Sequence, residues 1–191
     1  MKFYRGVLLF TLILIFLSII YLNYYLITYK DVYDHASQII KATGLIIFLF
    51  IISILYANVE IEVEGEHGWA QDLPTWTYGP EWIKNLLSGK YLTGYHTFLL
   101  LLFIPAIFHF PLFFTSWTIY KECVILGSYF FFVVVEDFMW FAFNPKYGLK
   151  RFNSRNKSIW WHRNWFGPLP DLYLEGMLIV LIMFSIGLPY F

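Results

Sequence analysis

Two adjacent carboxylates, Glu136 and Asp137, lie in an otherwise apolar stretch that runs from Cys123 to Phe143. An ionisable side chain at membrane depth costs roughly 2.5–3.5 kcal/mol on insertion scales, so such a residue needs a partner or a function. A carboxyl group in an apolar environment can also hold its proton at neutral pH and act as an acid. We therefore take Glu136 and Asp137 as candidate catalytic residues.

Aromatic side chains are dense around this pair. Trp140 follows Glu136 by one helical turn, Asn144 follows by two turns, and a tryptophan-rich segment contains Trp161 and Trp165. Aromatic faces can hold an isoprenoid or steroid-like body and stabilise a developing cation. This pattern predicts a lipophilic ligand, lipid or isoprenoid, bound by Trp140, Asn144, Trp161 and Trp165.

A divalent metal cofactor is a second hypothesis. His96 begins one apolar run, Glu175 lies one turn into another, and His162 precedes it. Imidazole and carboxylate groups are ligands suited to iron, zinc or manganese. His96, His162 and Glu175 are therefore candidate metal ligands beside the carboxylate pair, although no local metal motif such as His-Glu-x-x-His occurs.

A third hypothesis needs no ligand. Intramembrane carboxylates are often neutralised by basic side chains, and four of the cations in the segment after the carboxylate pair could reach it: Lys146, Lys150, Arg151 and Arg163. Ion pairs of this kind would suit a structural or assembly subunit of a membrane complex. Whether the protein is an enzyme stays open at this point.

Composition places these residues in a membrane protein. The 191 residues are 59% hydrophobic and only 14% charged, against roughly 25% charged in soluble domains. Five apolar runs reach or approach the length of a membrane span. They define an all-α polytopic bundle with a single domain over residues 1–191 and spans at about 6–28, 39–57, 95–117, 123–143 and 172–190.

Two polar loops, 58–94 and 144–171, separate these spans. Val59 to Glu64 alternate between apolar and acidic residues, which predicts a half-buried strand, paired in a small β-hairpin with Thr75–Tyr78. Pro80 to Gly89 has proline near its start and glycine near its end, which predicts a short interfacial helix. The acidic first loop and the basic second loop are expected to dock together.

The distribution of basic residues predicts the orientation. Ten of the 13 Lys and Arg residues lie at the amino terminus or in the two long loops. By the positive-inside rule, a prokaryotic cell membrane would have these segments in the cytoplasm and the carboxyl terminus outside.

The zero net charge argues against nucleic acid as a partner, so membrane lipid is the expected one. The lone Cys123 excludes an internal disulfide and a cysteine-based metal cluster. The sequence does not indicate the oligomeric state.

Three segments carry a family resemblance. They are Gly68-Trp69-Ala70-x-x-Leu73-Pro74-Thr75-Trp76, Glu136-Asp137-Phe138-x-Trp140-Phe141-x-x-Asn144-Pro145 and Trp160-Trp161-His162. In these the chain resembles a group of small multi-pass prokaryotic membrane proteins, over about two thirds of its length from the first long loop to the second. The resemblance implies an architecture and no activity.

Overall fold

The computed structural model describes residues 17, 21, 34–87, 89–156 and 159–190, and it is 68% helical. Within this part of the chain, four helical segments are long and apolar enough to cross a membrane: Gln38–Glu64, Gly94–Phe113, Ile119–Phe143 and Asp171–Tyr190. The predicted helical membrane architecture is confirmed for these four. The first predicted span, 6–28, lies outside the described residues.

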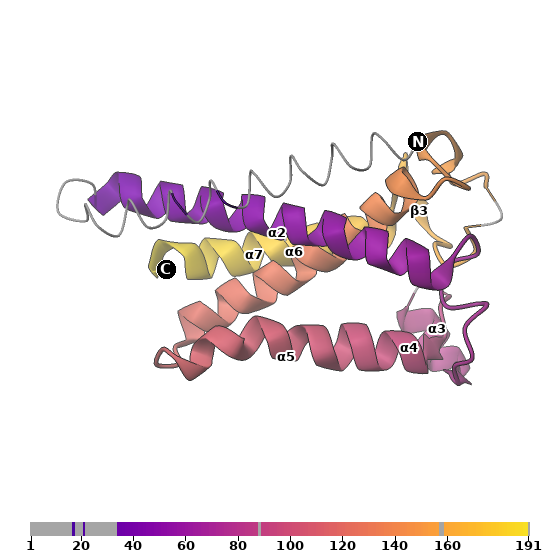
Figure 1. Ribbon diagram of the computed structural model, residues 1–191, viewed down its shortest axis with the longest axis horizontal. Helices are drawn as coiled ribbons and strands as arrows, with labels where there is room; N and C mark the ends of the chain where they lie inside the picture. Colours follow the sequence, from indigo (N-terminus) through magenta and orange to yellow (C-terminus); the bar gives the residue numbers. More distant parts are fainter. Residues whose placement is uncertain (1–16, 18–20, 22–33, 88, 157–158, 191) are drawn as a thin grey trace.

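Three long helices form the body of the bundle: α2 (Asp34–Glu64), α6 (Ile119–Phe143) and α7 (Asp171–Gly187), which continues into the 3₁₀ turn η5 (Leu188–Tyr190). Figure 1 shows α6 running obliquely beside α2 and α7. A fourth arm consists of four short segments: α4 (Gly94–His96), the π-helix η2 (Thr97–Phe103), α5 (Ile104–His109) and the 3₁₀ turn η3 (Phe110–Phe113). This arm packs on α6 through α5 and diverges from it toward α4 (Figure 1).

The π-helix explains how the arm accommodates Pro105. In η2 the backbone bonds span five residues, and the Ile104 N–H donates to the Leu99 carbonyl. Pro105 has no N–H, so the next bond in the series, to the Leu100 carbonyl, cannot form. The Tyr129 hydroxyl of α6 donates to that carbonyl instead, at 3.0 Å. The helix just before Pro105 is thus a π-helix tied to α6. The arm ends at Phe113, before the predicted boundary at 117.

The predicted strand over 59–64 is wrong, because α2 continues through Glu64. The same residues also fit a helical repeat: Glu60 and Glu64 are four apart and buried, whereas Val59 and Val63 are four apart and exposed. A helix satisfies all its backbone groups internally, which the membrane requires and a short hairpin edge cannot achieve. The second span, predicted over 39–57, therefore continues to Glu64.

The loops hold two small antiparallel sheets. Strand β1 (Thr77–Tyr78) pairs with β2 (Leu92–Thr93), and β3 (Trp165–Phe166) pairs with β4 (Leu169–Pro170). The short helix predicted over Pro80–Gly89 is present between the first two strands as α3 (Glu81–Leu86), and its place at the membrane interface stays a prediction. A 3₁₀ turn, η4 (Leu149–Arg151), lies in the second loop. The partner of Thr77–Tyr78 is thus Leu92–Thr93, not the segment 59–64.

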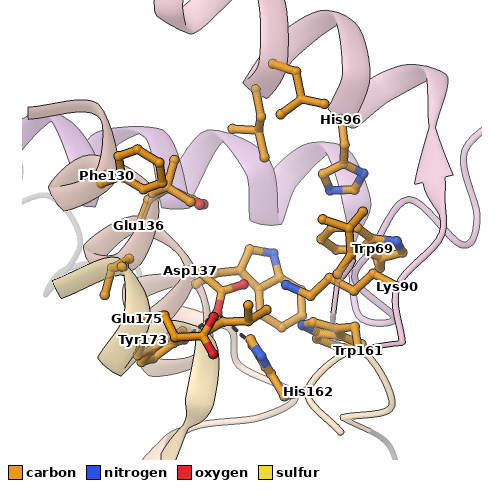
Figure 2. Close-up of a pocket in the computed structure, with 18 of the residues that line it drawn as sticks. Trp69, Lys90, His96, Phe130, Glu136, Asp137, Trp161, His162, Tyr173 and Glu175 are labelled. Carbon is orange, nitrogen blue, oxygen red and sulfur yellow. Dashed lines mark hydrogen bonds and ion pairs between the residues drawn. The ribbon is translucent and has the colours of Figure 1, made fainter. Parts of the chain in front are cut away.

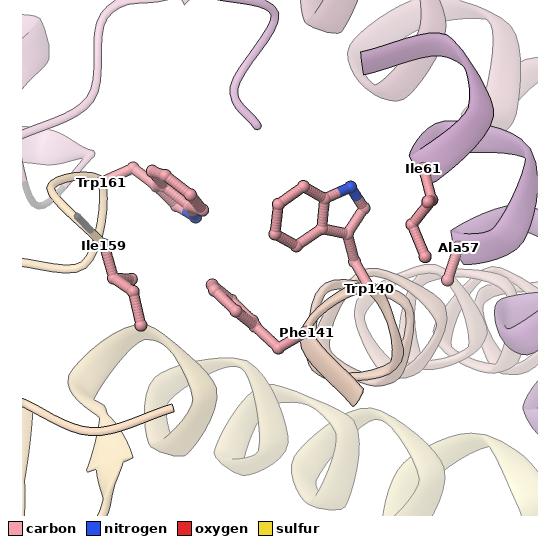
Figure 3. Close-up of a cluster of buried hydrophobic side chains, with 6 residues drawn as sticks. All are labelled: Ala57, Ile61, Trp140, Phe141, Ile159 and Trp161. Atoms are coloured by element: carbon pink, nitrogen blue, oxygen red, sulfur yellow. The ribbon is translucent and has the colours of Figure 1, made fainter. Parts of the chain in front are cut away.

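The two loops dock as their opposite charges predicted. Lys146 Nζ lies 2.6 Å from Glu66 Oε2, and the Asn144 side-chain amide donates to the Gly65 carbonyl at 3.0 Å. Beneath these contacts is a buried cluster made of α2, α6 and second-loop residues: Ala57, Ile61, Trp140, Phe141, Ile159 and Trp161 (Figure 3). This cluster fixes the second loop against the ends of α2 and α6.

Helices α6 and α7 approach closely because small residues lie between them. A Cβ added at Gly187 would be 2.7 Å from the backbone carbonyl oxygen of Tyr120, and one at Gly176 would be 2.6 Å from a single methyl group of Val134. Small residues at such positions are the usual means of close packing between membrane helices. The backbone of α6 cannot move aside at Gly187, whereas the Val134 side chain can rotate at Gly176.

We predict that Gly187→Ala destabilises the protein by about 1–3 kcal/mol, the usual cost of overpacking, because the added methyl group meets backbone atoms. Gly176→Ala is the matched control and should cost less. The measurement is the midpoint of thermal unfolding of each variant in mild detergent, with size-exclusion chromatography used to follow the loss of folded protein. Equal midpoints for the two variants would contradict the close backbone approach.

Candidate functional site

A cavity of about 330 Å³ lies among α2, the α4–η2 arm, α6, α7 and the two loops. The five polar residues that the sequence singled out as catalytic or metal-binding candidates all line this one cavity: His96, Glu136, Asp137, His162 and Glu175. Figure 2 shows them approaching it from different elements. Their convergence is a finding, and the roles assigned to them stay predictions.

Two carboxylates of α2, Glu60 and Glu64, complete the polar wall beside His96. The Nε2 atom of His96 lies 3.3 Å from Glu64 Oε1 and 3.8 Å from Glu60 Oε1. All three residues are buried, with at most 6% of any one exposed. Because Glu60 and Glu64 are one turn apart, both project from the same face of α2 toward the imidazole.

Three contacts fix the His96 ring. The Thr93 hydroxyl lies 2.7 Å from His96 Nδ1 and also accepts the His96 backbone N–H. The indole of Trp69 stacks on the imidazole with ring centroids 4.1 Å apart. The Nδ1 atom is thereby occupied, so Nε2 is the nitrogen that faces the carboxylates.

The Gly68-Trp69-Ala70 segment has an unusual backbone that positions two of these groups. All three residues have positive φ angles, of 64°, 50° and 53°. This conformation costs about 1–2 kcal/mol for each non-glycine residue and is concentrated at functional sites. It places Trp69 on His96 and directs the Ala70 N–H to Glu64 Oε1 at 2.6 Å. At Gly68 a Cβ would lie 2.9 Å from Trp140 and Trp161 atoms, so this position requires glycine.

Asp137 forms a second polar group with His162 and Tyr173. His162 Nε2 lies 2.9 Å from Asp137 Oδ2, and the Tyr173 hydroxyl donates to the same oxygen. Burial lowers the pKa of the His162 imidazole, and the Asp137 charge opposes that shift. A neutral imidazole that donates Nε2–H to a carboxylate keeps its lone pair on Nδ1. That Nδ1 atom is buried and has no hydrogen-bond partner among the described residues.

Glu136 is 2% exposed and lies beside Glu60, close enough for the two carboxyl groups to interact directly. Its Oε1 atom is buried and has no hydrogen-bond partner in the described part of the chain. Among the ion pairs between described residues, none joins Glu136 or Asp137 to the four cations expected as partners, and Lys146 pairs with Glu66 instead. The ion-pair hypothesis does not account for Glu136.

Lys90 is the basic side chain that lines the cavity. It is 9% exposed, and its Nζ lies 4.6 Å from the centroid of the Trp69 ring, a cation–π arrangement. Burial lowers the pKa of Lys90, while the carboxylates of Asp137 and Glu136 oppose this effect. One ammonium group therefore faces several carboxyl groups, so the polar end of the cavity is predominantly acidic.

The residues predicted to bind a ligand divide into two pairs. Trp140 and Trp161 line the cavity. Asn144 and Trp165 are not among the lining residues: Asn144 caps α6 and binds the first loop, and the Trp165 indole donates to the His162 carbonyl at 2.8 Å. The latter two position the second loop. Their predicted ligand-binding role has no support in the geometry.

Sequence reasoning missed Glu60, Glu64, Lys90, Trp69 and Tyr173. The signal for the first two was present, because Glu60 and Glu64 have i, i+4 spacing directly after an apolar helix. It was assigned to a strand because the same six residues also alternate. For Lys90 and Tyr173 the local pattern holds no such signal, since their place at the cavity depends on the docking of the loops.

The opposite end of the cavity is apolar. Farther from the loops along η2, α6 and α7 than the charged residues, the lining side chains are aliphatic or aromatic and carry no charge: Leu100, Leu101, Phe130, Val133, Val134 and Ile179. Leu101 is also half exposed on the outer surface of the arm. The cavity thus has a charged end beside the loops and an apolar end between membrane helices.

Comparison with protein-family models, curated proteins and solved structures finds no match to this chain. The resemblance to small multi-pass prokaryotic membrane proteins therefore stays a prediction from three sequence segments. The function has to be argued from the cavity itself.

The first loop provides a test of the electrostatics around the site. His67 Nδ1 lies 2.5 Å from Asp72 Oδ2, and this contact raises the pKa of His67. Because the folded-state pKa is raised, the stabilisation is fully present below the ordinary histidine pKa of about 6.5 and is lost as the pH rises through the higher value.

We predict that Asp72→Asn returns the His67 pKa toward about 6.5, measured by NMR of ¹³C-labelled histidine. The control Glu81→Gln should leave it unchanged, and an unshifted His67 in the wild type would contradict this ion pair.

Proposed function

We propose that this integral membrane protein binds and processes an amphiphile of lipid or isoprenoid type, with the polar group among the acidic side chains and the chain between η2, α6 and α7. The observation that carries the proposal is the division of one cavity into a charged end and an apolar end. The cavity volume, about 330 Å³, is in the range of small-molecule sites.

The acidic end favours a polar group that donates hydrogen bonds. Glu60, Glu64, Glu136 and Asp137 offer acceptor oxygens when ionised, and a hydroxyl or amine could donate to them. A bare phosphate group would instead face mainly like charges, opposed by the single Lys90. An isoprenoid or fatty alcohol or amine is therefore the class of ligand that this wall supports.

Acid–base chemistry is the reaction type that the side chains support. Asp137 accepts hydrogen bonds from His162 and Tyr173, which fixes the imidazole tautomer and leaves His162 Nδ1 as a proton acceptor. Glu136 is a buried carboxyl group with an unused oxygen beside the same cavity. A proton donor and a proton acceptor beside one largely apolar cavity are the components that proton transfer on a lipid-soluble substrate requires.

The cavity is proposed to face the cytoplasm of a prokaryotic cell, with the amino terminus inside and the carboxyl terminus outside. Support comes from the basic residues of the two loops that cover it, against Lys41 and Lys121 toward the other ends of their helices. A reporter enzyme that works only outside the cytoplasm should be active when it is fused after Phe191. A cytoplasmic reporter would overturn the orientation without affecting the cavity.

The ligand proposal predicts that the purified protein binds farnesol, an isoprenoid alcohol, with a saturable change in tryptophan fluorescence, because Trp69, Trp140 and Trp161 line the cavity. Ile179→Trp should fill the apolar end and weaken binding at least about tenfold, or ~1.4 kcal/mol. Mass spectrometry of an organic extract of the wild type should reveal a co-purifying amphiphile that Ile179→Trp loses.

Leu178→Trp is the matched control, since Leu178 precedes Ile179 on α7, is 58% exposed and does not line the cavity. It should retain both the fluorescence response and the extracted amphiphile. Wild-type protein without either signal, or equal losses in the two variants, would overturn the proposed function.

A further inference from the structure

We propose that Glu60, Glu64 and His96, with Glu136 beside them, form a binding site for one divalent transition-metal ion at the polar end of the cavity. The inference goes beyond the proposed function and does not depend on it, because the ligands are side chains of this chain alone. It also differs from the ligand set expected from the sequence, in which His96 was grouped with His162 and Glu175.

The donor atoms already have the spacing that an ion needs. One ligand atom each from Glu60, Glu64 and His96 lie within 4.8 Å of one another, and His96 Nε2 is 3.3 Å and 3.8 Å from the two carboxylate oxygens. Donors bound to one ion at about 2.1 Å are separated by about 3.0–3.5 Å in tetrahedral or octahedral geometry. An ion fits with small side-chain adjustments.

Unsatisfied oxygens give the independent reason to expect a ligand here. Glu60 Oε1 and Glu136 Oε1 are buried, and neither has a hydrogen-bond partner among the described residues. The two residues are 5% and 2% exposed, and their carboxyl groups adjoin each other across the α2–α6 contact. A buried acceptor without a donor costs about 1–3 kcal/mol and more when charged, so a cation at this point relieves two such costs at once.

The surrounding contacts orient the ligands as a metal site requires. Thr93 occupies His96 Nδ1 and leaves Nε2 for an ion, and the Ala70 N–H binds the Glu64 carboxylate. Ligating imidazoles and carboxylates are usually held by hydrogen bonds of this kind. Trp69 stacks on the imidazole and shields it.

Charge balance favours a divalent ion over a further ammonium group. Glu60 and Glu64 face His96, and Glu136 adjoins Glu60. Asp137 is already paired with His162 and Tyr173, and Lys90 lies over Trp69. A set of carboxylate oxygens and one imidazole suits Mn²⁺, Fe²⁺ or Zn²⁺. The imidazole argues against Mg²⁺ and Ca²⁺, which prefer oxygen ligands alone, and the four side chains contain no sulfur for a soft ion.

The test uses the full-length protein in mild detergent, stripped with a chelator and titrated with Mn²⁺ and, separately, Zn²⁺. We expect one ion per chain for at least one of the two metals. Glu60→Gln and Glu64→Gln should each weaken binding at least tenfold. The matched control is Glu62→Gln, which removes the same charge from an exposed position on α2 and should leave binding unchanged.

A second measurement needs no substitution, in case the glutamine variants do not fold. Pulsed electron paramagnetic resonance of Mn²⁺ on the wild-type protein should show coupling to one imidazole nitrogen, and His96→Gln should lose it. The proposal is overturned if neither metal binds, if Glu62→Gln loses as much affinity as Glu60→Gln, or if bound Mn²⁺ shows no nitrogen coupling. Carboxyl groups that hold protons in place of a metal would give the first of these results. Ile179→Trp should still bind the ion, which separates this proposal from the amphiphile.

Discussion

The cost of holding carboxyl groups inside a membrane bundle is the constraint on which the other features depend. Glu60, Glu64 and Glu136 come from two helices and are at most 5% exposed. Two like charges 4 Å apart repel by about 4 kcal/mol at an effective dielectric constant of 20. The fold therefore has to supply protons, donors or a cation at this point, and the Ala70 N–H and His96 supply only part of what is needed.

The rest of the architecture serves to bring compensating groups to these acids. The docked loops carry Trp69, Lys90 and His162 to the ends of α2 and α6, and the buried cluster around Trp140 and Trp161 holds them there (Figures 2 and 3). The cavity lies where the α4–η2 arm diverges from α6 (Figure 1). Loop docking and helix divergence together produce one site with two chemically different ends.

The sequence was sufficient for the helices and for part of the site. Apolar runs located four spans, and topology brought His96, Glu136, Asp137, His162 and Glu175 to one end. The alternation over 59–64 misled because a short segment can fit both a two-residue and a 3.6-residue period, and only the membrane environment decides between them. For Asn144 and Trp165 the ligand-binding role stays a prediction, because a polar or aromatic residue near a site can position a loop as well as bind a ligand, and both make loop contacts.

The central claim is that Glu60 and Glu64 of α2 converge with His96 on a single point. Its most direct measurement is a crystal structure of the protein grown with Mn²⁺, with anomalous diffraction recorded to locate the ion. The account predicts one anomalous peak within about 2.0–2.4 Å of Glu60, Glu64 and His96 donor atoms. A map without a peak between these side chains, or a structure in which Glu60 and Glu64 point away from His96, would contradict it.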